Sequence, residues 1–177
     1  MIIKAGIEYA RALSEIGTET FIDAHQDSAP VHEIQTYVKE KYSIAAIKKE
    51  LSDPANIYHI IMHGDKIAGF SKMALNGKHP AITTGKITKL DQIYLLKSFY
   101  GLKLGAQLLQ YNIDYSKSHN QSGMWLVVWT GNDRAVNFYE RYGFQVISED
   151  GFHLTETHTN PCYTMLLDYA ANENTGD

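Results

Sequence analysis

Cysteine is almost absent from the chain, and this scarcity excludes several kinds of site. Cys162 is the only thiol among 177 residues, so one chain can form neither an internal disulfide nor a zinc site built from several thiolates. Because Cys162 lies in an apolar run, we expect a buried strand thiol rather than a nucleophile. A reducing cytoplasm is the simplest setting for such a chain, and it is the localisation that we predict.

Long apolar segments are missing too. No apolar run approaches the roughly 18 residues that a membrane-spanning helix needs. The segment Met1–Ala10 lacks the continuous apolar core of a signal peptide. We therefore expect neither export nor a membrane partner.

Clusters of one charge are also absent. The 16 lysines and arginines and the 20 aspartates and glutamates leave a net charge of −4, with no long run of either sign. A nucleic-acid partner is not expected, because phosphate backbones are bound through concentrated positive charge. The histidine pairs His59/His63 and His153/His158 lack a third ligand, so we expect no metal site.

The length and the 44% of apolar residues suit one domain with a full core, which we place at residues 1–170, followed by a polar tail at 171–177 that should fray. Helical and alternating apolar spacing predict a mixed α/β (α+β) domain with a central, mostly antiparallel sheet flanked by helices. In chain order we expect a helix over 8–26, a helical region over 31–51 interrupted near Tyr42, a β-hairpin over 58–75, a strand over 87–95, a helix from Leu104, a strand over 124–129, a helix from Asn132 to Gly143, and strands over 144–147 and 163–167.

The stretch Leu90–Tyr111 is the first functional signal. It reads as a strand, a short loop with glycines, and a helix. Backbone N–H groups at a helix N-terminus lack partners and carry partial positive charge, so a strand that leads into such a loop favours a bound phosphate. This stretch predicts a phosphate-bearing cofactor.

The second signal is the spacing Asn132-x-x-Ala135-x-x-Phe138-Tyr139-x-x-x-Gly143-Phe144. It resembles a helix signature of the GNAT superfamily of acyl-CoA N-acyltransferases. Within that superfamily the chain is most similar to bacterial spermidine/spermine (polyamine) N-acetyltransferases, with which it shares Ile93-Tyr94, Ser98-Phe99, Leu108-Leu109, the strand with two tryptophans and the segment 135–143. The likeness extends over residues 8–168.

One loop departs from the superfamily pattern. The pyrophosphate loop there has Gln or Arg, two residues, Gly, one residue, and Gly or Ala; the matching positions here are Tyr100, Lys103 and Gly105. With helical angles at position 103, a lysine is sterically acceptable and its ammonium is either a surface group or a phosphate ligand. Otherwise the loop must open and the affinity for acyl-CoA falls.

The resemblance implies acetyl-CoA as the cosubstrate and assigns residues to it. Backbone groups around Tyr94 would pair with the pantetheine amides, the loop would bind the pyrophosphate, and the helix after Asn132 would complete the site. The implied cofactor-binding residues are Ile93, Tyr94, Leu95, Tyr100, Gly101, Leu102, Lys103, Leu104, Gly105, Asn132, Phe138 and Tyr139.

Two residues are implied to be catalytic. Tyr139 would donate a proton to the leaving thiolate, because a phenol with a pKa near ~10 stays protonated at neutral pH. Asp91 would accept the proton of the amine through a bound water. The alternatives are a packing tyrosine and an ordinary solvated aspartate, while Trp125 and Trp129 are expected in the core.

The acceptor is harder to predict. The resemblance places its pocket among Asp23, His25, Asp27, Glu33, Tyr37 and Glu156, whose carboxylates and rings would suit a polyamine. The same composition would suit a basic peptide. The leading expectation is an N-acetyltransferase that acts on a primary amine, best a polyamine; the alternatives are a protein or peptide acetyltransferase and a catalytically weak GNAT-fold module that binds acyl-CoA or regulates a partner. The resemblance also suggests a homodimer joined through the C-terminal strands.

Overall fold

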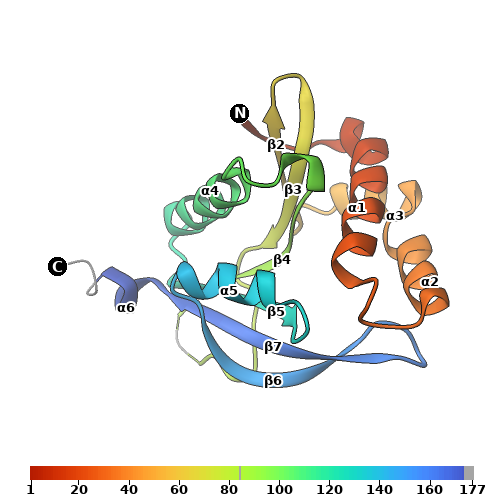
Figure 1. The fold of residues 1–177 in the computed structure, drawn as a ribbon. Helices are drawn as coiled ribbons and strands as arrows, with labels where there is room; N and C mark the ends of the chain where they lie inside the picture. The colour runs from red at the N-terminus through yellow and green to blue at the C-terminus, as the bar shows by residue number, and fades with distance from the viewer. Residues whose placement is uncertain (84, 174–177) are drawn as a thin grey trace.

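The computed structural model describes residues 1–83 and 85–173, which form one seven-stranded sheet with helices on both faces (Figure 1). The helices α1 to α3 gather on one side of the sheet, and α4 and α5 lie on the other (Figure 1). The elements are β1 (Ile2–Lys4), η1 (Ile7–Tyr9), α1 (Ala10–His25), α2 (Val31–Lys41), α3 (Ile44–Leu51), β2 (Ile57–His63), β3 (Lys66–Ala74), β4 (Ile87–Leu95), η2 (Lys97–Phe99), α4 (Leu104–Ser118), β5 (Gly123–Trp129), α5 (Asp133–Arg141), β6 (Gln145–His153), β7 (Thr159–Asp168) and α6 (Tyr169–Glu173).

The strand order is β1-β2-β3-β4-β5-β7-β6, and among the strands that the structure describes only β4 and β5 pair in parallel. The predicted mixed α/β fold with a mostly antiparallel sheet is therefore confirmed. The predicted hairpin is β2 and β3, whose turn contains Gly64 with a φ of +59°. The predicted break near Tyr42 separates α2 from α3, and Ser43 caps α3 by accepting a hydrogen bond from the Ala46 N–H.

The two parallel strands separate soon after they meet. Their pairing consists of Ile87 with Gly123, Thr88 with Met124, and Lys89 with Trp125. Beyond Lys89, β4 continues to Leu95 and β5 to Trp129 without pairing to each other. The sheet therefore opens into a V between these strands.

A bulge in β4 marks the point of separation. Lys72 of β3 faces Gln92, whereas Met73 faces Leu90, so Asp91 is the extra residue on β4. A bulge places two neighbouring side chains against one partner and increases the local twist. This geometry turns β4 away from β5 just where the V begins.

Several details differ from the sequence expectations. The strand β1 is a new edge element that pairs with β2, and the first helix starts with the short turn η1 before α1. The strands expected over 144–147 and 163–167 are longer, because β6 and β7 pair from Gln145 with Leu166 to His153 with Thr159. The expected tail begins within the short helix α6, and residues 174–177 lie outside the described residues. Among the described residues, no helix combines the length and apolarity needed to cross a membrane.

Candidate active site

A cleft of about 610 Å³ occupies the opening between β4 and β5. It is surrounded by the unpaired edge of β4, the loop before α4, the first turns of α4 and α5, and the end of α1. Its lining residues are Asp23, Ala24, His25, Leu90, Asp91, Gln92, Ile93, Tyr94, Leu95, Lys97, Phe99, Tyr100, Gly101, Lys103, Leu104, Gly105, Ala106, Val128, Trp129, Asn132, Arg134, Ala135, Phe138, Tyr139 and Arg141. We call this cavity the cleft below.

The edge of β4 supplies backbone hydrogen-bonding groups to the cleft. From Leu90 to Leu95 the strand is paired with β3 on one side only, because β5 has turned away. An extended, amide-bearing chain can pair with such an edge as an added strand would. Ile93, Tyr94 and Leu95, to which the family resemblance assigns pantetheine binding, lie on this edge.

The N-terminus of α4 supplies unpaired donors. No side chain caps this helix and its first turn has no acidic residue, so the first backbone N–H groups remain available for an anion. Gly101, at a φ of +82°, turns the loop before the helix. Lys103 adopts φ 57° and ψ 15°, which is left-handed helical geometry and is strained for a residue with a Cβ.

Both ends of α5 are fixed by local hydrogen bonds that position Tyr139. At the start, the Ala135 N–H donates to the Asn132 side chain at 3.1 Å. At the end, the Gly143 N–H donates to the Glu140 carbonyl and the Phe144 N–H to the Tyr139 carbonyl, with Gly143 at a φ of +86°. Asn132 and Gly143, between which the sequence predicts this helix, therefore cap its two ends.

Tyr139 lines the cleft from α5 and is 9% exposed. Its ring packs against Phe144 with centroids 5.6 Å apart. Burial raises the pKa of Tyr139 well above its usual value of 10, so the hydroxyl keeps its proton at neutral pH. The side chain is therefore a proton donor and not a base.

Asp91 lines the cleft at the bulge of β4, but two lysines occupy its carboxylate. Lys89 Nζ lies 2.6 Å from Oδ1 and Lys72 Nζ lies 3.2 Å from Oδ2. Burial alone would raise the pKa of Asp91, but the two ammonium groups outweigh it and hold the pKa below its usual value. Asp91 is thus ionised, with little tendency to take up a proton.

His25 lines the cleft from the end of α1 and, unlike Asp91, has a group that is free to accept a proton. Its Nδ1 lies 3.1 Å from the Phe21 carbonyl, to which only a protonated Nδ1 can donate. Burial lowers the pKa of His25 below its usual value of 6.5, although the Phe21 contact opposes this shift. The neutral ring then carries its lone pair on Nε2, which has no hydrogen-bond partner among the described residues. Sequence reasoning placed His25 only among acceptor-pocket residues.

The expected acceptor residues are only partly brought together. Asp23 and His25 line the cleft, whereas Asp27, Glu33, Tyr37 and Glu156 are not among its lining residues. The Asp23 carboxylate pairs with Lys97 Nζ at 2.7 Å. Glu33 instead accepts hydrogen bonds from the hydroxyls of Thr155 and Thr157 and so ties α2 to the loop between β6 and β7. That part of the expected pocket is a structural contact.

All predicted catalytic and cofactor residues except Leu102 line the cleft. Leu102 points elsewhere and is 46% exposed. Among the residues that sequence reasoning missed, Arg134 stacks on Tyr100, and Trp129 lines the cleft rather than the core.

Trp125 is buried as expected and donates from Nε1 to the Gly77 carbonyl. Cys162 is buried too, and burial raises its pKa to about 11, which suits an inert thiol.

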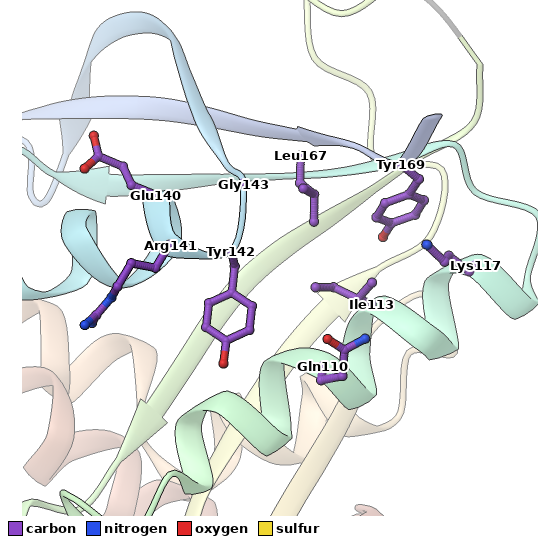
Figure 2. Close-up of a pocket in the computed structure, with 9 residues that line it drawn as sticks. All are labelled: Gln110, Ile113, Lys117, Glu140, Arg141, Tyr142, Gly143, Leu167 and Tyr169. Atoms are coloured by element: carbon purple, nitrogen blue, oxygen red, sulfur yellow. The ribbon is translucent and has the colours of Figure 1, made fainter. Parts of the chain in front are cut away.

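A second cavity, of about 400 Å³, lies beside the C-terminal end of α5, between α4 and the end of β7 (Figure 2). Tyr142 and Gln110 lie at one part of it, and Lys117 and Tyr169 at another (Figure 2). Lys117 Nζ lies over the Tyr169 ring, 5.1 Å from its centroid. None of the predicted site residues lines this cavity.

Comparison with known proteins agrees with this geometry. The sequence model of the acetyltransferase (GNAT) family matches residues 11–144, which include both β4 and α5. The chain belongs to the GNAT acetyltransferase family. An uncharacterised N-acetyltransferase of Lactobacillus delbrueckii subsp. lactis is 26% identical over 140 residues, covering 78% of this chain and 80% of that protein. One of Mycobacterium tuberculosis is 26% identical over 157 residues, covering 89% and 96%.

Two solved N-acetyltransferase structures share the fold. The PaiA N-acetyltransferase of Thermoplasma acidophilum, solved in complex with coenzyme A, has a TM-score of 0.77 at 21% identity, with 96% of this chain and 98% of that chain covered. The ribosomal-protein-S18-alanine N-acetyltransferase of Escherichia coli has a TM-score of 0.68 at 16% identity, with 95% and 92% covered.

This GNAT acetyltransferase is therefore an enzyme that uses acetyl-CoA as its cosubstrate. The residues present fit that molecule. The open edge of β4 matches its amide-bearing arm, and the uncapped first turn of α4 matches its phosphates.

Proposed function

We propose that the protein transfers the acetyl group of acetyl-CoA to a primary amine, and that a polyamine is the first acceptor to test. The observation that carries this proposal is the cleft itself, which is lined by Tyr139, by the unpaired edge of β4 and by the first turn of the uncapped helix α4. When bound, acetyl-CoA supplies the reactive thioester. The chain's own residues must orient it, accept one proton and donate another.

Tyr139 holds the proton that the leaving sulfur needs. Its pKa lies above the usual value because of burial, so the phenol remains a donor across the neutral range. A positioned acid or base typically contributes about 10²–10⁴ in rate. The backbone N–H groups of Ile93 and Leu95 are placed to orient the acyl donor along the edge of β4.

Two side chains are candidates for the proton acceptor. Asp91 is the residue that the family resemblance favours, yet its carboxylate already pairs with Lys72 and Lys89. His25 has an unoccupied Nε2 and a ring that lies near both strand ends, with centroids 6.5 Å from Tyr94 and 6.3 Å from Trp129. An amine that enters from the α1 side would meet His25 between the two arms of the V.

A pH profile separates the two candidates. A base works only when deprotonated, so the rate falls as the pH drops through its pKa. With His25 as the base, the acidic limb of kcat/KM lies below pH 6.5; with Asp91, it lies below pH 3.8. The variants His25→Gln and Asp91→Asn should each remove the limb only if the substituted residue is the base.

The charge of the acceptor side is more balanced than the sequence suggests. The two carboxylates that line the cleft, Asp23 and Asp91, each pair with lysine. A polyamine would have to compete with Lys97 and Lys89 for these groups. The neighbouring rings of Tyr94 and Trp129 offer it cation–π contacts.

A panel of amines with acetyl-CoA tests the proposal by release of free thiol. The panel contains spermidine, spermine, an aminoglycoside, and basic peptides with a free N-terminus or with lysine. Turnover of spermidine or spermine is expected; turnover of peptides alone would replace the polyamine by a protein acceptor. No turnover of any amine, despite acetyl-CoA binding, would favour a regulatory module.

A homodimer and a cytoplasmic location are further parts of the proposal. Edge strand β6 leaves Val146, Ile147 and Phe152 between 37% and 45% exposed, which supports an interface at the C-terminal strands. Light scattering after gel filtration gives the molar mass. A monomeric mass at micromolar concentration would remove the dimer from the proposal.

A further inference from the structure

A cation–π contact spans the mouth of the cleft. The Arg134 guanidinium carbon lies 3.6 Å from the centroid of the Tyr100 ring. Arg134 belongs to the first turn of α5, whereas Tyr100 belongs to the loop that leads into α4. Both residues line the cleft, so the contact joins its two sides at the phosphate-facing end.

The guanidinium is held in place but its hydrogen-bonding capacity is unused. Among the residues that the structure describes, Arg134 forms no ion pair with a carboxylate, and its side chain donates no hydrogen bond. Stacking occupies one face of the planar group and leaves its N–H edge available. A fixed, unpaired guanidinium at a cavity mouth is suited to an anion with two oxygens in one plane.

The surroundings of Arg134 favour the same ligand. Lys103 lines the cleft on the opposite side and likewise has no carboxylate partner among the described residues. The first turn of α4 offers unpaired backbone N–H groups and contains no acidic side chain. Lys97, by contrast, is neutralised by Asp23 at 2.7 Å. Positive charge is therefore available at the α4 end of the cleft and compensated at the α1 end.

We propose that Arg134, held on the Tyr100 ring, binds the pyrophosphate of acetyl-CoA and supplies from α5 the guanidinium that the loop before α4 does not contain. Arg134 is a binding residue, and Tyr100 is a positioning residue that acts through it. The inference rests on the use of acetyl-CoA in the proposed function. It also accounts for the tyrosine at position 100, since an aromatic ring is what the stacked arginine requires.

The first test measures binding by calorimetry, with coenzyme A and 3′-dephospho-coenzyme A as ligands. Charge-assisted hydrogen bonds of this kind should make Arg134→Gln bind coenzyme A about 10- to 100-fold more weakly. Arg134→Lys keeps the charge but loses the planar fork, so its loss should be smaller. Arg11→Gln, an exposed arginine on α1, is the matched control and should bind like the wild type.

The two ligands identify the phosphate. If Arg134 binds the pyrophosphate, Arg134→Gln loses the same factor with both ligands. If the loss disappears with 3′-dephospho-coenzyme A, the contact is to the 3′-phosphate and the pyrophosphate assignment is wrong. Equal affinities of wild type and Arg134→Gln for both ligands overturn the proposal. Circular dichroism melting of each free variant confirms that the fold is retained.

A double-mutant cycle tests the role of Tyr100. Tyr100→Leu should weaken coenzyme A binding in the wild type and should have no further effect in Arg134→Gln, because Tyr100 acts only by holding the guanidinium. Additive losses would contradict that coupling. A wild type that fails to bind coenzyme A would contradict the proposed function itself, an outcome distinct from equal binding by the wild type and its variant.

Discussion

Tyr139 combines two roles that one substitution separates. Its ring is packed against Phe144, and its side chain lines the cleft. Tyr139→Phe keeps the ring and removes only the proton donor, so we expect kcat to fall by about 10²-fold or more while the Kd for acetyl-CoA changes little. Steady-state kinetics with a calorimetric Kd check this. Tyr142→Phe, which lies at the second cavity, is the control, and an unaltered rate in Tyr139→Phe would remove the phenol from the mechanism.

Lys103 carries backbone strain at the cofactor loop. At a φ of 57° a Cβ is unfavourable, so Lys103→Gly should raise the free energy of unfolding, by up to about 1 kcal/mol after the added entropy of glycine is subtracted. Urea denaturation measures it. Leu102→Gly, at a neighbour without a positive φ, should lower stability instead.

The same Lys103→Gly variant reports on the cofactor. Tighter acetyl-CoA binding would show that the side chain obstructs the loop, and weaker binding would show that the ammonium contacts a phosphate. The sequence left these two readings open because it does not contain the backbone angle. In the structure this angle is left-handed, with a φ of 57° at Lys103.

The residues of the site were predictable where a spaced motif contains them. Asn132, Phe138, Tyr139 and Gly143 follow one helical pattern, and each occupies the expected place. Arg134 lies within the same pattern, but its importance depends on a ring from another element. Such contacts between distant segments leave no periodic signal in the sequence, and the tautomer of His25 likewise depends on a carbonyl one turn earlier.

At the scale of the element, β6 shows why strand lengths were underestimated. Nearly all of its nine residues are exposed, since it is the outer strand of the sheet. A strand with two solvated faces has no alternation of apolar and polar residues, and Glu149-Asp150-Gly151 resembles a turn. The buried strands β2 to β5 were recognised because their side chains are selected by packing.

The contact of α2 with the β6–β7 loop has a pH signature. The hydroxyls of Thr155 and Thr157 lower the pKa of Glu33 below its usual value of 4.5. A carboxylate with a depressed pKa stabilises the fold at pH values above 4.5, and this contribution is lost as the pH falls through the lower, folded-state pKa. Glu33→Gln should therefore be less stable than the wild type at pH 7, with the difference shrinking toward pH 3.

Thermal melts across this range measure the Glu33 effect. Glu40→Gln, an exposed residue of the same helix, should show no comparable change. A Glu33→Gln deficit that is equally large at pH 3 would mean that the loop depends on the shape of the side chain and not on its charge.

At the scale of the whole molecule, acetyl-CoA should stabilise the fold. A ligand that binds only the native state adds RT ln(1 + [L]/Kd), or about 2.7 kcal/mol at a hundredfold excess over Kd. A thermal-shift titration should show a melting temperature that rises with the logarithm of the acetyl-CoA concentration. Acetate plus AMP at matched concentrations is the control, and an unchanged melting temperature at millimolar acetyl-CoA would contradict acetyl-CoA binding.

The overall fold was predictable because most of its helices and strands have a recognisable local pattern of apolar residues. Helical and alternating apolar spacing predicted the order of helices and strands, and the resemblance to a family agreed with their arrangement. The short strand β1 could not be found in this way, since three residues carry no periodicity and its pairing partner lies more than fifty residues away.

The brief parallel pairing of β4 with β5 leaves residues 90–95 of β4 without a strand partner on the side of the cleft. Backbone groups without a strand partner are less protected from solvent than those in a paired ladder. An extended cofactor in the V acts as a removable strand beside β4. Hydrogen exchange at the backbone amides of residues 90–95 should therefore slow when acetyl-CoA binds. The cofactor would then protect the edge of β4 in addition to donating the acetyl group.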